Sequence, residues 1–120
     1  MKKSIITALV SIPFSLSVFA TADGPDYFQV RNVRSDDVLN MRIKPDWRSK
    51  KVGEIPFSGI CLKNLGCVGG LTIDESTLPE KEQNKIRKKR PIWCKVKYKN
   101  IVGWVSGRYI TEGQYDECYK

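Results

Sequence analysis

The chemistry open to this chain depends first on its four cysteines and on a residue type that it does not have. The 120-residue sequence contains no histidine, and its cysteines form an even set: Cys61, Cys67, Cys94 and Cys118. Zinc sites use ligands paired two to four residues apart, and no two of these cysteines have that spacing. An even number of cysteines in a small exported chain predicts a disulfide framework, so we expect two disulfides and no metal.

Catalysis is hard to assemble from the remaining side chains. Without histidine, a serine or cysteine nucleophile lacks its usual general base, and the four thiols are expected to be paired. Adjacent carboxylates fall in predicted turns, a linker or the tail, where solvated acids are ordinary: Asp36 and Asp37, Asp74 and Glu75, Asp116 and Glu117. Gly69 and Gly70 lack the context of a phosphate-binding loop. We therefore expect a protein with no catalytic residues and no cofactor.

The N-terminus has the pattern of an export signal. Two lysines precede a largely apolar run over residues 5–19, and Ala20 and Ala22 form a small-x-small cleavage pattern. The run is too short and too interrupted to be a membrane span; a buried N-terminal helix is the alternative. We expect residues 1–22 to be removed, which lowers the formal net charge from +8 to +6. The mature chain would begin near Asp23 and be periplasmic or secreted.

Short alternating segments predict one all-β domain over residues 23–120, which is long enough for one modest core. Strand-like runs between turn residues are expected at residues 27–33, 38–43, 52–55, 60–65, 92–98 and 101–105. The turn between the last two is expected at Lys99 and Asn100. Trp104, in the last of these strands, is expected to belong to the core.

Residues 74–90 differ in kind and predict a short helical insertion. Thr77 and Glu80 have the spacing of a capping box, and Pro79 suits the start of a helix. Acidic residues come early and basic residues late, as the helix dipole favours, with a basic end made of Lys85, Arg87, Lys88, Lys89 and Arg90. A solvated helix end is the ordinary role of such a run, and the alternative is contact with an anionic envelope polymer or lipid headgroups. Export argues against a nucleic-acid partner.

The order and spacing of these motifs resemble those of bacterial SH3-like (SH3b) domains. The matching segments are DVLNMR at 37–42, VGEIP at 52–56 and W-x-K-V-x-Y…GWVSGRYI at 93–110. The chain is more similar to exported stand-alone members, which have NLGC before a helical insertion and WCKV after it, here 64–67 and 93–96. The resemblance implies a half-open barrel of five to six strands with a one-turn helix near Gly107. It also implies a non-enzymatic module that binds cell-wall peptides or other extracytoplasmic partners.

The cysteines can pair in three ways. If the strand that ends at Cys67 and the strand that begins near Cys94 are antiparallel neighbours, these two residues meet at the mouth of the insertion. Their bridge would then point toward the core and be poorly accessible, because Cys94 lies on the apolar face of its strand. Cys61 would pair with Cys118 and fasten the C-terminal tail, residues 113–120. Neither of these last two cysteines belongs to the general SH3-like pattern.

Aromatic residues are the best candidates for binding a ligand. SH3 domains bind peptides in a groove lined by rings, and Trp47 and Trp93 are expected to be exposed, with Tyr27 and Tyr109 as neighbours. Trp93 could equally be incidental surface, and Tyr109 could be structural. Two functions remain open. One is an exported binding module for a cell-wall peptide or envelope partner, and the other is a secreted or periplasmic inhibitor, immunity or effector-like protein that binds another protein.

Overall fold

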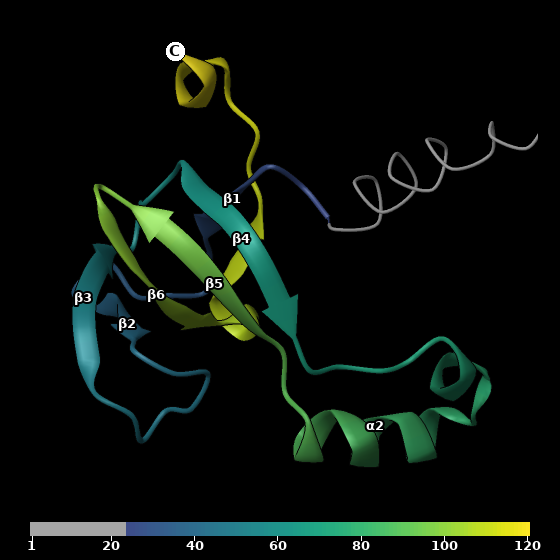
Figure 1. Ribbon diagram of the computed structural model, residues 1–120. Helices are drawn as coiled ribbons and strands as arrows, with labels where there is room; N and C mark the ends of the chain where they lie inside the picture. Colours follow the sequence, from purple (N-terminus) through teal and green to yellow (C-terminus); the bar gives the residue numbers. More distant parts are fainter. Residues whose placement is uncertain (1–23) are drawn as a thin grey trace, which may run out of the picture.

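The body of the protein is one antiparallel sheet that curls into a half-barrel (Figure 1). The computed structural model describes residues 24–120. Within them the sheet has seven strands: β1 (Tyr27–Val30), β2 (Val38–Arg42), β3 (Lys51–Pro56), β4 (Leu62–Val68), β5 (Trp93–Tyr98), β6 (Ile101–Ser106) and β7 (Ile110–Glu112). The strands lie in the order β3-β2-β6-β5-β4-β1-β7, and the expectation of an all-β fold is confirmed.

The sheet has more strands than the five to six expected, and β7 is the strand that sequence patterns miss. It follows a one-turn 3-10 helix, η4 (Gly107–Tyr109), and pairs with β1, where Val30 is the partner of Ile110. A strand of three residues is too short to show the period-two pattern that marks strands in a sequence. Pairing with a distant strand therefore defines β7.

Alternate residues of the strands fill the core. Every second residue of β1 and β2 is buried, as expected when one face of a strand is covered. All seven strands contribute to the core: Phe28, Val30, Leu39, Met41, Ile55, Leu62, Cys94, Val96, Val105 and Ile110. Full burial of one such aliphatic or aromatic side chain stabilises a protein by roughly 1.5–3 kcal/mol, so this core holds the half-barrel together.

The hairpin of β5 and β6 follows the expected pattern, with one correction. Lys99 and Asn100 both have positive φ, as a two-residue hairpin turn requires. Gly103 and Val105 take the inward positions of β6 and are buried, while Trp104 between them is only half-buried. The expectation that Trp104 belongs to the core is therefore wrong, because successive residues of a strand face opposite sides of the sheet.

The insertion between β4 and β5, residues 69–92, stands apart from the half-barrel as an arm (Figure 1). It holds a 3-10 helix, η3 (Asp74–Thr77), and one α-helix, α2 (Glu80–Lys89), and neither contains a buried residue. The expected capping box is absent, because Thr77 ends η3 and α2 begins only after Pro79. The side-chain amide of Gln83 instead donates to two backbone oxygens of the preceding segment and joins the two helices.

A disulfide clamps the base of the arm. Cys67 and Cys94 are partners across β4 and β5, and they are bonded as expected. Cys94 is only 3% exposed, but Cys67 is exposed because it lies near the end of β4, beyond the core. The expectation of a poorly accessible bridge is thus correct for one of its two residues. Just beyond the bridge, the N–H of Gly70 donates to the backbone oxygen of Arg90 at 2.7 Å and closes the base further.

A second disulfide fastens the C-terminal tail. Cys61 immediately precedes β4 and is bonded to Cys118, which lies in the short 3-10 helix η5 (Asp116–Tyr119). This is the other pairing expected from the sequence. Together the two bridges use every cysteine of the described residues.

Two expectations concern the ends of the chain and the membrane. The predicted signal peptide, residues 1–22, and the mature start at Asp23 lie outside the described residues. Within residues 24–120, no helix has the length and apolar character needed to cross a membrane.

Candidate functional site

Three of the four predicted aromatic residues line one groove, which we call the aromatic groove. Trp47, Trp93 and Tyr109 come from a loop, a strand and a 3-10 helix, and they surround a volume of about 860 Å³. Residues 32–40 form part of one wall, and the base of the arm forms part of another. Sites for small ligands usually measure about 300–1,000 Å³, so the groove is large enough for a short peptide.

Strand pairing holds Trp93 in place, and a capped 3-10 helix holds Tyr109. Trp93 opens β5 opposite Ser106, and its side chain is half-buried, less exposed than expected. The chain then turns into η4, where the hydroxyl of Ser106 accepts a hydrogen bond from the N–H of Arg108 at 3.3 Å. Tyr109 is also half-buried and packs against the core. Tyr109 therefore combines a structural role with a place in the groove.

Trp47 stands on a braced loop between β2 and β3. Its side chain is 66% exposed, as expected, and the guanidinium of Arg48 lies 5.1 Å from the ring centroid. Asp46 Oδ1 accepts from the N–H of Arg48 at 2.9 Å, and Ser49 Oγ donates to the backbone oxygen of Asp46 at 2.7 Å. These local bonds restrict the loop, so a ligand that contacts the ring orders little additional chain.

The aromatic groove is strongly basic. Its lining has one carboxylate, Asp37, and five arginines: Arg34, Arg42, Arg87, Arg90 and Arg108. Asp37 Oδ1 already accepts a hydrogen bond from the N–H of Val38 at 2.7 Å. Two more carboxylates, Asp36 and Glu75, pair with Arg34 and Arg90, and the excess of positive charge that remains creates a potential that attracts anionic ligands.

The structure divides the predicted basic end of the helix into two groups. Arg87 and Arg90 line the aromatic groove. The other three basic residues are exposed and lie outside the groove lining: Lys85, Lys88 and Lys89. Two of the five predicted residues are therefore placed where a ligand in the groove would meet them.

Glu75 of η3 holds Arg90 in position. Its carboxylate accepts from the N–H of Thr72 at 2.9 Å and forms an ion pair with Arg90. The hydrogen bond from the Thr72 backbone, followed by that from Arg90, lowers the pKa of Glu75 from its ordinary value of 4.5. Glu75 is therefore ionised at neutral pH and keeps one arm arginine beside the groove.

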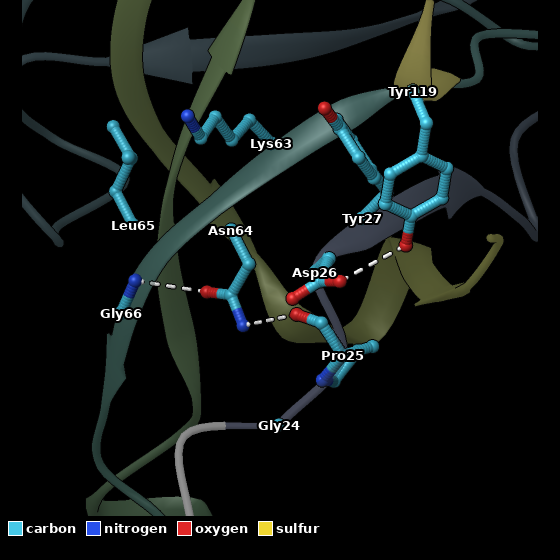
Figure 2. A pocket seen from close by; sticks show the side chains of 9 residues that line it. All are labelled: Gly24, Pro25, Asp26, Tyr27, Lys63, Asn64, Leu65, Gly66 and Tyr119. Atoms are coloured by element: carbon cyan, nitrogen blue, oxygen red, sulfur yellow. Dashed lines mark hydrogen bonds between the residues drawn. The ribbon is translucent and has the colours of Figure 1, made fainter. Parts of the chain in front are cut away.

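Tyr27, the fourth predicted aromatic residue, lies at a different pocket, which we call the tail pocket (Figure 2). Its ring meets Tyr119 of η5 edge-on, with 5.1 Å between centroids and an angle of 87° between planes. The tail pocket has a volume of about 520 Å³ and shares no lining residue with the aromatic groove. The structure therefore does not bring Tyr27 to the other three aromatic residues.

Asp26, Asn64 and Tyr119 of the tail pocket are bonded to neighbouring parts of the chain, whereas Lys63 has no acceptor within the described residues (Figure 2). Asn64 donates from Nδ2 to the backbone oxygen of Pro25 and accepts at Oδ1 from the N–H of Gly66, both at 2.8 Å. The hydroxyl of Tyr119 donates to Asp26 Oδ2 at 3.0 Å. Desolvation of this hydroxyl, followed by its bond to Asp26, raises the pKa of Tyr119 above its ordinary value of 10.0. The bond of Asn64 to Pro25 joins the start of the described chain to β4, and the bond of Tyr119 to Asp26 joins it to the tail.

The side chains of the aromatic groove are suited to binding a ligand. Within residues 24–120, no three histidine, cysteine or carboxylate residues gather closely enough to hold a metal ion. The rings of the groove can pack on apolar or peptide surfaces. Its guanidinium groups can donate paired hydrogen bonds to a carboxylate or a phosphate.

The sequence does not single out three of the groove's arginines: Arg34, Arg42 and Arg108. An isolated arginine beside a strand is an ordinary surface residue, and its approach to the groove depends on how the sheet curls. One signal was available for Arg108, because it directly precedes the candidate Tyr109 in the segment SGRYI. Arg42 ends the matching segment DVLNMR, but nothing in that segment indicates a groove, and Arg34 carries no signal.

Comparison with known proteins assigns this chain to no family. No family model matches it, and no significantly similar protein is found among curated ones. The aromatic groove is therefore the main indication of function.

Proposed function

We propose that this protein is an exported, non-enzymatic binding module that holds a cell-wall peptide or another envelope ligand in the aromatic groove. The observation that carries the proposal is the convergence of Trp47, Trp93 and Tyr109 on one groove. SH3 domains bind extended peptides against aromatic rings in this manner. We further propose that the half-barrel, with its one-turn η4 helix, is an SH3-like domain with an added arm and tail.

The proposed location is the periplasm or the cell exterior. Two disulfides in so short a chain fit an oxidising compartment. The pattern over residues 1–22 fits a cleaved export signal. Cell-wall peptides and envelope proteins are present in that compartment, and we propose no nucleic-acid partner.

Binding is favoured over catalysis by the groups available in the groove. The sequence has no histidine to act as a general base. The carboxylate of Asp37 is bonded to the backbone of the next residue, and all four cysteines are in disulfides. The proposal therefore includes no cofactor and no covalent step.

Purified peptidoglycan tests this function. Wild-type protein should bind it saturably, and Trp47→Ala should weaken binding about tenfold or more, because an aromatic anchor of an interface commonly contributes upward of about 1–2 kcal/mol. Trp104→Ala is the matched control, since it removes a half-buried tryptophan that does not line the groove. Saturable binding that survives Trp47→Ala and Trp93→Ala would contradict the role of the groove.

A second candidate is a secreted or periplasmic inhibitor, immunity or effector-like protein that binds another protein. Tryptophan, tyrosine and arginine are the residue types that most often dominate protein–protein binding energy, and the groove presents all three. A pull-down from an envelope extract separates the two functions. One stoichiometric protein partner, without saturable binding to peptidoglycan, would favour this second function.

A further inference from the structure

The five arginines of the aromatic groove differ in whether their guanidinium groups already bond to other residues of the protein. Four are bonded within the chain: Arg34 to Asp36, Arg42 to the backbone of Ser49, Arg87 to Gln83 and Asn84, and Arg90 to Glu75. The guanidinium of Arg108 donates to no acceptor within residues 24–120. Arg108 therefore has its full set of donors open to a ligand.

The backbone of Arg108 is fixed although its side chain is exposed. On one side, the N–H of Gly107 donates to the backbone oxygen of Ile92 at 2.8 Å. On the other side, the backbone oxygen of Tyr109 accepts from the N–H of Arg31 at 2.8 Å. A Cβ at Gly107 would lie 2.8 Å from Cγ2 of Ile92, so η4 packs directly against the base of the arm. The guanidinium thus extends from a rigid point in the groove lining.

We infer that the aromatic groove binds a short peptide with a free carboxylate, and that Arg108 binds this carboxylate. The inference rests on the proposed function and names its ligand class. A guanidinium matches a carboxylate with two parallel N–H···O bonds, which fixes orientation as well as charge. The rings of Trp47 and Trp93 would pack against the peptide on either side of the carboxylate.

The lining of the groove favours a cell-wall peptide over a phosphate polymer or a lipid surface. Such anionic surfaces bind arrays of unpaired cations. In the groove, four of the five arginines are already bonded within the chain, and the lysines of the arm lie outside it. The groove instead combines one unoccupied guanidinium with three rings in about 860 Å³. That combination suits one carboxylate together with the backbone and apolar groups of a few peptide residues. The stem peptides of the cell wall are short and end in a carboxylate.

Stem peptides released from purified peptidoglycan by an amidase are the probe. One portion is used as released, and in another the carboxylates are converted to carboxamides. In titration calorimetry, wild-type protein should bind the free acids about tenfold or more tightly than the amides, as expected for a hydrogen bond to a charged group. Arg108→Gln should lose most of this preference and keep only the part that the other groove arginines contribute. Lys97→Gln, which removes the same charge at an exposed site outside the groove, should keep the difference.

Each outcome decides between the inference and the proposed function. Equal affinity of wild-type protein for acids and amides would overturn the inference and leave peptide binding in place. A preference for acids that keeps its wild-type size in Arg108→Gln, with the variant folded by circular dichroism, would overturn the assignment to Arg108. If neither peptide form binds wild-type protein, both the inference and the wall-peptide function fail. Tight binding to phosphatidylglycerol vesicles in that case would replace them with a membrane-surface role.

Discussion

The aromatic groove and the tail pocket both contain tyrosine and charged residues, but those groups are bonded differently. In the tail pocket, Asn64 of β4 and Tyr119 of the tail bond to the start of the described chain, and the charges of Asp26 and Lys63 are equal and opposite. In the groove, five arginines face one carboxylate, and Arg108 has no acceptor in the described part of the chain. Polar groups that satisfy one another stabilise a fold, whereas excess charge in an open groove attracts a ligand. The excess of positive charge in the groove, which the tail pocket lacks, is therefore a reason to propose the groove as the binding site.

Removal of the tail disulfide should have the largest effect on stability and little effect on binding. In the chain-entropy model, the bridge between Cys61 and Cys118, which are 57 residues apart, contributes about 4 kcal/mol. The double variant Cys61→Ser/Cys118→Ser should lose about that much free energy of unfolding in urea titrations. Its affinity for peptidoglycan, measured where it remains folded, should match that of wild-type protein.

That variant probes whether the two regions are independent. They share no lining residue. If folded protein without the tail disulfide also lost binding in the groove, the tail would be shown to shape the groove. The two regions would then not be independent.

Replacement of the arm should have a smaller effect on stability and a larger one on binding. Exchange of residues 76–90 for a short Gly-Ser loop should cost about 1 kcal/mol, because closure entropy changes slowly with loop length. Binding of free-acid peptides should weaken several-fold, since Arg87 and Arg90 leave the groove. Circular dichroism and calorimetry measure the two effects.

A triple variant is the matched control for the arm. Changing Lys85, Lys88 and Lys89 to glutamine removes three cations of α2 that do not line the groove. It should bind the peptides nearly as well as wild-type protein at moderate salt. Loss of folding in the loop replacement would instead show that the arm supports the core, against the absence of buried residues in η3 and α2.

Sequence patterns predict the parts of this structure that depend on local periodicity. The turn at Lys99 and Asn100 follows from two alternating strands, and the pairing of Cys67 with Cys94 follows once those strands are antiparallel neighbours. The same alternation could have placed Trp104 correctly. Its neighbour Val105 is buried in the core, and adjacent residues of a strand face opposite sides of the sheet.

Sequence patterns do not predict the positions of Tyr27 and Arg108, because these depend on how distant segments come together in the curled sheet. Tyr27 is separated from the groove because it begins β1 opposite Lys63 of β4, whereas the chain reaches the groove only past the other end of β1, at residues 32–34. Arg108 enters the groove only because η4 packs against the base of the arm. Neither fact is visible in a pattern of apolar and polar residues along the chain.

Alkaline pH should produce the smallest effect, confined to the tail pocket. The pKa of Tyr119 is raised above 10.0, so its protonated form contributes stability that is fully present below pH 10.0 and is lost as the pH rises through the folded-state pKa. Absorbance titration of tyrosinate should show a late-titrating group that disappears in Tyr119→Phe. Tyr115→Phe, at a tail tyrosine outside the pocket lining, should retain it. A late group that survives Tyr119→Phe would contradict the assignment.

The three tryptophan indole N–H signals give the most direct test of the binding site. Protein labelled with nitrogen-15 is titrated with free-acid stem peptides, and the signals are assigned with single Trp→Phe variants. We predict saturable shifts at Trp47 and Trp93 and little change at Trp104, which lies outside the groove lining. Shifts confined to Trp104, or no shift at Trp47 and Trp93 under conditions where calorimetry shows the peptide bound, would place the ligand elsewhere and contradict the claim that the aromatic groove is the binding site.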